Sequence, residues 1–380
     1  MLKKVRITNF KSLEDVSVNL EEITVLVGRS GSGKTNFVEA LRFVRQLLYD
    51  RNWNFIYINP LGWQRFIPAT VKLPVTMSFE FIFSVDGIDG NYKYKLAFTV
   101  EKIDSVTIAE ETLKLKEELL FCVQNGGWLH PPKVLNPPNP LSLVLGSISG
   151  MQEIAVAYVS LTSGLGCYDF PTTVLGETSQ PSKLAGFSDS GSNYFQSFAA
   201  IENNLQAISN WKEIIAALKV LDPSIRSIET GKPENGKIIV SHDIGERILQ
   251  LNLDQESEGF RRYLSHLIAL YQSPPKQTLI FEEAEKGIHP GALEALAEQF
   301  LACPNSKRGQ IVLTTHSPEL LNKFDVADIR VVEIRNHLTQ IGPVAKDQLD
   351  SIKEKLMTTG ELLTVNKARI ADATTYGAGA

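Results

Sequence analysis

The chain has 380 residues, two to three times the length of a typical single domain. Hydrophobic residues make up 43% of the sequence and charged residues 21%, which excludes a disordered or fibrous chain. The formal net charge of −5 disfavours a strongly basic nucleic-acid binder. We expect no membrane span and no signal peptide, because no sufficiently long apolar segment occurs. The three widely spaced cysteines indicate reduced thiols and a cytoplasmic location.

The first part of the chain predicts strands around one helix. Three strands are expected at residues 2–8, 14–20 and 23–28. An amphipathic helix is expected from about Asn36 to Leu48. Residues 73–100 contain two alternating segments around Asp-Gly turns, which predict a β-hairpin.

The middle of the chain is less regular. Residues 131–140 are half proline, which disfavours helix and strand there. Residues 161–192 are rich in Gly, Ser and Thr and read as a loop or lid. Two helices are expected near residues 194–208 and 210–220. The sequence shows no sustained heptads, so we expect no long coiled coil.

The last third predicts alternating strands and helices. The expected strands are residues 238–242, 247–253, 277–281, 311–317 and 329–334, and the expected helices are residues 259–271 and segments beginning at Pro290 and Pro318. Short apolar strands that alternate with helices are typical of a parallel α/β sheet. We therefore expect four segments: an N-terminal part at 1–120, an insertion at 121–236, a C-terminal part at 237–345 and a C-terminal helix and tail at 346–380.

One glycine-rich segment follows the predicted strand 23–28 and matches the phosphate-loop pattern G-x-x-x-x-G-K-[ST], known as Walker A. Its residues are Gly28, Arg29, Ser30, Gly31, Ser32, Gly33, Lys34 and Thr35, followed by Asn36. Glycines allow backbone N–H groups to surround a phosphate at a helix N-terminus. We expect the loop to bind ATP, Lys34 to reach the β- and γ-phosphates, and Thr35 to ligate Mg²⁺.

An apolar strand that ends in two acids gives the Walker B pattern. Glu282 is expected to hold Mg²⁺, and Glu283 is expected to act as the general base that polarises the attacking water. His316 ends the next predicted strand and is expected to contact the γ-phosphate. Ser257, Glu258 and Gly259 precede a helix about twenty residues before this strand and form another candidate anion site. Gln64 is a weak candidate for the Q-loop glutamine.

These motifs, in this order, resemble the ABC-type ATPase head of the RecF/SMC/OLD class, and most of all small bacterial RecF-like ATPases without a coiled coil. The elements that carry the resemblance are Val5–Leu13, Ser257–Gly259 with Arg261 and Arg262, Glu282-Glu283, Ile288-His289-Pro290 and Thr314–Pro318. The resemblance implies an α/β P-loop NTPase head with a β-rich N-terminal subdomain and a mixed insertion between Walker A and the signature motif. The chain departs from the class pattern at Phe260, Glu282 and Ala284.

The resemblance also implies how the protein works. ATP and Mg²⁺ would hold two heads together as a homodimer, with Ser257–Gly259 of one head contacting ATP on the other. The ATP-dependent switch would control either DNA engagement or a separately encoded effector protein, for which we expect a nuclease. The biological role would be DNA repair or anti-phage defence. The segment after His316 is shorter than an ordinary domain, so no nuclease centre is expected in this chain. The alternatives are a transporter ATPase subunit, a P-loop kinase and a nucleotide-binding module with little hydrolysis.

Overall fold

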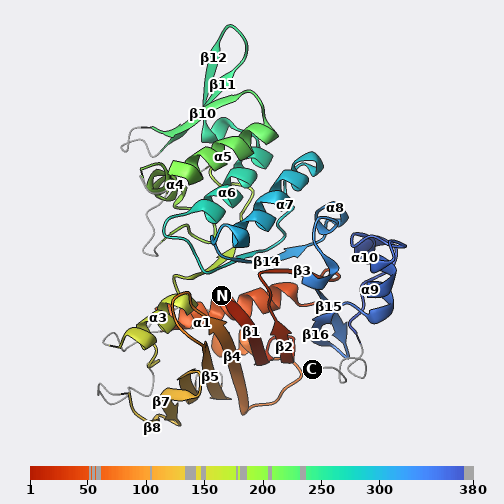
Figure 1. Cartoon of the computed structure of the whole chain (residues 1–380). Helices are drawn as coiled ribbons and strands as arrows, with labels where there is room; N and C mark the ends of the chain where they lie inside the picture. The colour runs from red at the N-terminus through yellow and green to blue at the C-terminus, as the bar shows by residue number, and fades with distance from the viewer. Residues whose placement is uncertain are drawn as a thin grey trace. The chain divides into compact units, whose positions relative to one another are not determined.

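A computed structural model describes most of the chain. The described residues are 1–50, 53, 56, 61–102, 105–132, 143–146, 151–176, 179, 186–203, 208–231 and 237–371. The chain divides into two compact units (Figure 1). The first comprises Met1–Leu165, Val326–Met357 and Val365–Ala380, and the second comprises Gly166–Asp325 and Thr358–Thr364. Within the described ranges, no helix combines the length and hydrophobicity needed to cross a bilayer.

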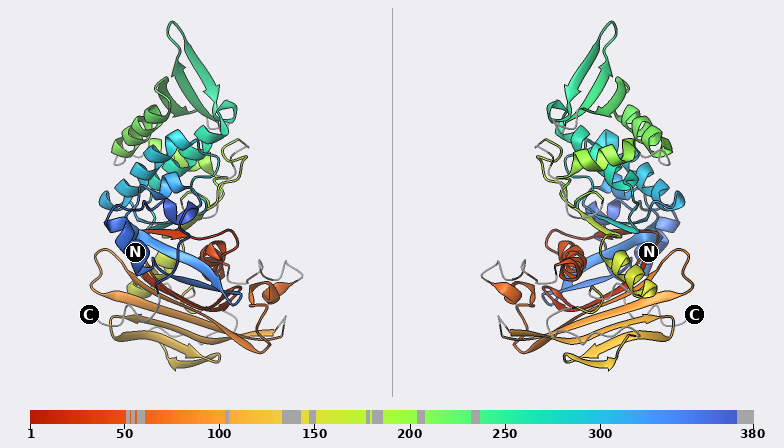
Figure 2. Two further views of the ribbon diagram at one scale, coloured as in Figure 1. Left: turned by 90° about the vertical axis from the view of Figure 1, so that its right-hand side faces the viewer. Right: turned by 90° about the vertical axis from the view of Figure 1, so that its left-hand side faces the viewer.

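The largest sheet of the first unit has seven antiparallel strands (Figure 2). In spatial order they are β2 (Leu13–Asn19), β1 (Leu2–Phe10), β4 (Val75–Ser84), β5 (Asn91–Lys102), β6 (Ser105–Leu115), β7 (Glu118–Gln124) and β8 (Gly127–His130). On β4, Met77, Phe79 and Phe81 are buried and alternate with more exposed residues. This period of two places one face of the sheet in the core and leaves the other toward solvent.

Helix α1 (Lys34–Tyr49) packs on the buried face of this sheet through aromatic contacts. The ring centroid of Phe43 lies 5.4 Å from that of Phe10 on β1 and 5.7 Å from that of Phe79 on β4. It also lies 4.5 Å from the ring of Phe66. Aromatic rings at these separations attract one another in addition to burying apolar area. The packing therefore positions α1 on the sheet.

A smaller group of strands completes the first unit. Strand β3 (Ile23–Val27) pairs in parallel with β15 (Ile329–Arg335), which pairs in antiparallel with β16 (Leu338–Pro343). All residues of β3 are buried, as expected for a parallel strand covered on both faces. Other helices described in this unit are η1 (Gly62–Phe66), α3 (Gln152–Leu161), η5 (Val326–Asp328) and α9 (Lys346–Lys353).

The second unit combines parallel strands with helices. Strands β13 (Thr278–Phe281) and β14 (Gln310–Thr315) are parallel, and β9 (Leu165–Tyr168) lies beside β13. The helices described in this unit are α4 (Tyr194–Glu202), α5 (Ile208–Leu221), η4 (Leu253–Gln255), α6 (Glu258–Tyr271), α7 (Pro290–Asn305), α8 (Pro318–Leu321) and α10 (Glu361–Thr364). An antiparallel three-stranded sheet contains β10 (Ile225–Thr230), β11 (Ile238–Asp243) and β12 (Ile248–Asn252) (Figure 1).

Most expected elements are present near their predicted positions. The expected strand at 23–28 is β3, and the expected helix begins at Lys34 rather than Asn36. The interpretation of residues 161–192 as loop is wrong at Leu165–Tyr168, which form the buried strand β9. The segment is only four residues long and lies among glycines, so it gave no periodic signal. Most of the proline-rich segment, residues 133–140, lies outside the described residues.

Candidate nucleotide-binding site

The phosphate loop, Gly28–Thr35, joins strand β3 to helix α1 in the first unit, and its glycines are required by the geometry. Gly31 and Gly33 have φ values of +76° and +103°, which side-chain-bearing residues rarely adopt. A Cβ atom on Gly28 would lie only 2.1 Å from the carbonyl oxygen of Val332. The loop can therefore form this tight turn only with glycine at these positions.

The N-terminus of α1 provides a positive end for the loop. Gly33 is the N-cap residue, and no acidic side chain lies in the first turn to neutralise the helix dipole. Thr35 is exposed in this turn, as are Arg29 and Ser30 in the loop. A helix N-terminus with unneutralised N–H groups favours a phosphate group.

Two side chains within the loop are suited to an anionic ligand. The Lys34 side chain is buried, with the residue 6% exposed, and its Nζ donates to the carbonyl oxygens of Gly28 and Arg29 at 2.7 and 3.0 Å. The ammonium group is thereby held over the loop. The Ser32 hydroxyl is buried and has no hydrogen-bond partner among the described residues. A phosphate oxygen would supply an acceptor, so the loop fits the phosphates of ATP.

Asn36 is connected to the backbone of the phosphate loop through two hydroxyl groups. Its Nδ2 donates to the Ser12 hydroxyl at 2.7 Å, and the Ser12 and Thr339 hydroxyl oxygens are 2.6 Å apart. Thr339 in turn donates to the carbonyl oxygen of Ser32 at 2.9 Å. Ser12 and Thr339 come from distant parts of the sequence, so the loop motif alone gave no indication that they would contact it.

Apart from Gln64, the other predicted site residues lie in the second unit, where Ser257–Gly259 begin helix α6. The Ser257 side chain is the N-cap and accepts a hydrogen bond from Phe260 N at 3.2 Å. Glu258 pairs with Arg262 at 2.9 Å. A Cβ atom on Gly259 would lie 3.3 Å from the carbonyl oxygen of Gly287, in the loop after Walker B. The start of α6 therefore packs closely against that loop.

The two Walker B acids follow strand β13. The backbone N–H of Glu282 donates to Tyr168 O at 2.9 Å, and that of Glu283 donates to the Thr314 hydroxyl at 2.8 Å. Glu283 has a φ of +45°, and its side chain is 48% exposed. A left-handed backbone at a residue other than glycine is costly and occurs most often at functional sites. Its carboxylate lies 3.7 Å from Lys286.

His316 follows strand β14 and is tied to the Walker B loop through Glu285. The backbone N–H of His316 donates to Glu285 Oε1 at 2.6 Å, while Glu285 Oε2 is buried without a partner among the described residues. Glu285 was not a candidate at the level of sequence, because a third acid after two others carried no distinct motif. The structure thus brings Glu283 and His316 into one connected loop system of the second unit.

A side chain of the three-stranded sheet also contacts the segment just before α6. His242 on β11 lies 2.8 Å from the Glu256 carboxylate through Nε2 and 2.8 Å from the Ser224 hydroxyl through Nδ1. Glu256 directly precedes Ser257. His242 therefore holds the residue before the signature serine, a role that no sequence motif indicated.

Gln64, the weak Q-loop candidate, lies exposed in the short helix η1. As for metal binding, the described residues contain no group of three or more His, Cys, Asp or Glu side chains arranged to hold an ion. Mg²⁺ that binds together with nucleotide phosphates needs only one or two protein ligands. The hydroxyl of Thr35 and the half-buried carboxylate of Glu282 have the oxygen chemistry that this role requires.

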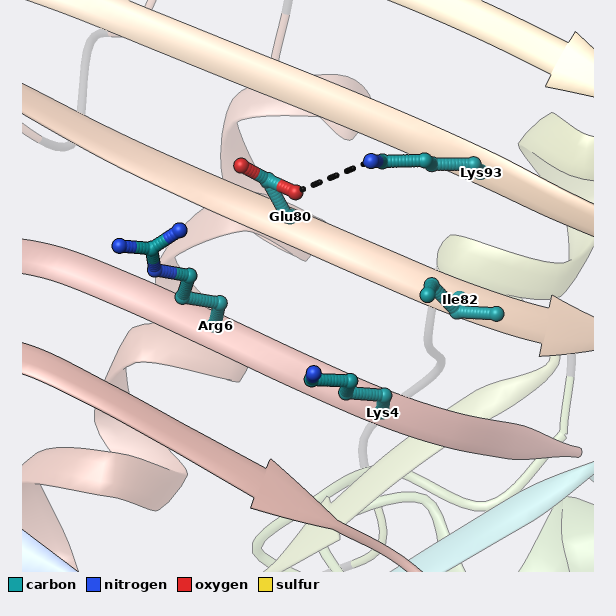
Figure 3. Close-up of a pocket in the computed structure, with 5 residues that line it drawn as sticks. All are labelled: Lys4, Arg6, Glu80, Ile82 and Lys93. Atoms are coloured by element: carbon teal, nitrogen blue, oxygen red, sulfur yellow. Dashed lines mark ion pairs between the residues drawn. The ribbon is translucent and has the colours of Figure 1, made fainter. Parts of the chain in front are cut away.

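A shallow hollow on the outer face of the seven-stranded sheet differs in kind from the phosphate loop. It measures about 210 Å³ and is lined by Lys4, Arg6, Glu80, Ile82 and Lys93 (Figure 3). Lys93 lies 3.6 Å from Glu80, and Arg6 donates two hydrogen bonds to Asp15. Its cations are largely paired, and its strand residues provide no helix N-terminus. We therefore do not assign the nucleotide to this hollow.

Comparison with solved structures finds similar folds. The chain resembles an SMC head bound to the C-winged helix domain of ScpA, with 14% identity, a TM-score of 0.56, and coverage of 92% of this chain and 99% of that one. It resembles the SMC head domain from Thermotoga maritima, with 14% identity, a TM-score of 0.50, and coverage of 90% of this chain and 98% of that one. It also resembles an Smc head domain with an extended coiled coil bound to the C-terminal domain of ScpA derived from Pyrococcus furiosus. Here the identity is 12%, the TM-score is 0.53, and the match covers 93% of this chain and 99% of that one. Identity this low supports a shared fold only.

Comparison with protein families gives a more specific result, although a search of curated proteins finds no match. The family described as "AAA ATPase domain" matches residues 1–225, and that described as "AAA domain, putative AbiEii toxin, Type IV TA system" matches residues 130–322. Each match covers more than half of the chain. The expected α/β fold of an ABC-type P-loop NTPase head is confirmed. The chain belongs to the AAA ATPase domain family, and its fold is similar to that of SMC heads.

Proposed function

We propose that this protein is an ATP-driven molecular switch that binds ATP with Mg²⁺, dimerises and hydrolyses the nucleotide. The observation that carries the proposal is the phosphate loop itself. Its glycines meet strict steric demands, Lys34 is held over the backbone, and the buried Ser32 hydroxyl lacks an acceptor. These features together suit a group that is anionic and rich in acceptor oxygens, as the phosphates of ATP are.

The chemistry follows from the residue types. Lys34 would neutralise charge on the β- and γ-phosphates, while Thr35 and Glu282 would hold Mg²⁺. Glu283 would accept a proton from the attacking water, and His316 would contact the γ-phosphate. The left-handed backbone at Glu283, held by its N–H bond to Thr314, supports this role, because such strain is found most often at functional sites.

The signature residues would act in trans. Ser257 and Gly259 stand at the N-terminus of α6, so their backbone and hydroxyl groups suit a phosphate of ATP bound to a second copy of the chain. The resemblance to RecF/SMC/OLD heads supports this arrangement. Loss of the γ-phosphate after hydrolysis would remove contacts that hold the dimer, as in other nucleotide switches.

For the output we favour control of a separately encoded effector protein. The family descriptions include a putative toxin of a toxin–antitoxin system, and two similar SMC heads are bound to domains of ScpA. Both comparisons concern proteins that work with protein partners. A nuclease effector, with a role in DNA repair or anti-phage defence in the cytoplasm, remains our first expectation.

DNA engagement is the second candidate output, and one observation favours it. The outer face of the seven-stranded sheet carries Lys4 and Arg6 on β1 and Lys93 on β5, on either side of β4, in a chain of net negative charge (Figure 3). Lys4 forms no ion pair with a described residue. Exposed cations on one face can contact the phosphates of DNA without reading its sequence.

Mass measurement together with ATP turnover tests the proposed function. We expect the wild-type protein to hydrolyse ATP, and the Glu283→Gln variant to shift from monomer to dimer when ATP and Mg²⁺ are added. A transporter subunit would require a membrane partner for its activity. A nucleotide-binding module would bind ATP without turnover, and this result would refute the hydrolytic switch.

A further inference from the structure

Strand β16 reaches the phosphate loop through one buried side chain. The Thr339 hydroxyl donates to the carbonyl oxygen of Ser32 at 2.9 Å, and Thr339 is 2% exposed. Its side chain also occupies the space next to Gly33, because a Cβ atom there would lie 2.1 Å from Thr339 Oγ1. Thr339 is therefore in contact with the last two residues of the loop before Lys34.

The direction of the surrounding hydrogen bonds can be deduced from proton counting. A hydroxyl group has one proton, and that of Thr339 is used on Ser32 O. In the 2.6 Å contact between Ser12 and Thr339, Ser12 must then be the donor. The Ser12 oxygen in turn accepts from Asn36 Nδ2 at 2.7 Å. The result is an ordered chain from Asn36 through Ser12 and Thr339 to the loop backbone.

A backbone hydrogen bond fixes the position of this chain. Thr339 N donates to Ser12 O at 2.9 Å, so strand β16 and the turn after β1 are joined by main chain as well as side chain. Both segments belong to the first unit, as does the phosphate loop. The Thr339 hydroxyl therefore comes from a framework that does not depend on the loop for its own position.

The hydrogen bond to Ser32 O sets the orientation of the peptide between Ser32 and Gly33. In a planar trans peptide, the C=O and N–H groups point in opposite directions. Because the carbonyl points toward Thr339, the N–H of Gly33 points away from it, toward the opposite side of the loop. No described residue accepts a hydrogen bond from this N–H. It is thus one of the donors available to a phosphate oxygen.

We infer that Thr339 is a positioning residue for nucleotide binding: its hydroxyl orients the Ser32–Gly33 peptide so that the Gly33 N–H faces the phosphates. This inference rests on the proposed function of the loop as the ATP site. Valine has nearly the shape of threonine but no donor, so the hydroxyl can be removed without opening a cavity. Serine keeps the donor and loses only a methyl group.

Calorimetric titration with ATP and with ADP tests the inference on Thr339→Val and Thr339→Ser. We expect Thr339→Val to weaken both affinities by about tenfold, the value of one well-placed hydrogen bond, and Thr339→Ser to stay within about threefold of wild type. The matched control is Thr112→Val, which removes another buried hydroxyl of the first unit, one that lies 3.1 Å from a carboxylate oxygen of Glu110 and 3.4 Å from the sulfur of Cys122. Its nucleotide affinity should not change, even where its thermal stability falls.

The outcomes separate the two proposals. Wild-type protein that binds no ATP would refute the proposed function and the role of Thr339 with it. Wild-type protein that binds ATP, together with unchanged affinity in Thr339→Val, would overturn the role of Thr339 alone. An equal loss of affinity in Thr339→Ser would also overturn it, because packing would then be the cause. If Thr339→Val does not fold, Thr339→Ala replaces it, with the same expected loss of about tenfold, and its comparison with Thr339→Ser isolates the hydroxyl.

Discussion

Replacing Glu283 by glutamine should remove ATP hydrolysis and leave the fold and ATP binding intact. The carboxylate is about half exposed, and the ion pair it forms, 3.7 Å from the equally exposed Lys286, is worth at most about 1 kcal/mol. The hydrogen bond to Thr314 uses the backbone N–H of residue 283 and is kept in the variant. We therefore expect the free energy of unfolding to change by less than about 1 kcal/mol.

The effect on turnover should be far larger. Loss of a general base typically lowers the rate by about 10²–10⁴-fold, which raises the barrier by roughly 3–5 kcal/mol. Phosphate release measures turnover, and calorimetry measures the ATP affinity of the same preparation. The control is Lys286→Gln, which breaks the same ion pair and keeps the carboxylate, so its turnover should stay within about threefold of wild type. Turnover within about twofold in Glu283→Gln with ATP bound would refute the general-base role.

Three further predictions concern assembly and output. A Ser257→Arg chain mixed with a Lys34→Ala chain should regain turnover that neither has alone, and a failure in all mixing ratios, with dimers shown to form, would argue against action in trans. The purified chain should not cut DNA with Mg²⁺, whereas cutting that persists after Glu283→Gln would reveal an effector centre. Charge reversal of Lys4 and Lys93 should weaken any DNA binding without changing ATP affinity. The slope of log binding constant against log salt concentration should fall in magnitude by about one to two units, and unchanged DNA binding would exclude this face.

The phosphate loop is the part of the molecule that the sequence predicted best, because its chemistry depends on local spacing. The strand before it, the helix after it and the position of Lys34 all follow from neighbouring residues. The requirement for glycine at position 33 has two causes, and only one is local: the left-handed φ belongs to the loop, while the contact with Thr339 comes from β16.

The contacts that support the loop could not be predicted from the sequence, because they join residues that are far apart in the chain. Ser12 and Thr339 meet only because the turn after β1 and strand β16 are adjacent in the folded unit. Glu285 likewise gains a partner, the backbone of His316, through the pairing of β13 with β14. Strand β9 was missed because four buried residues have no measurable period. Nonlocal packing decided each of these features.

The central claim, that the phosphate loop binds ATP, is tested most directly by titrating Lys34→Ala with ATP. Two loop carbonyls hold the wild-type ammonium over the loop, where it would donate to the β- and γ-phosphates of ATP, and hydrogen bonds from a charged donor contribute about 1.5–3 kcal/mol each. We expect at least a hundredfold loss of affinity, with unchanged affinity in Lys353→Ala, a control at an exposed position of α9. ATP affinity equal to wild type in a folded Lys34→Ala variant would contradict the assignment of this loop.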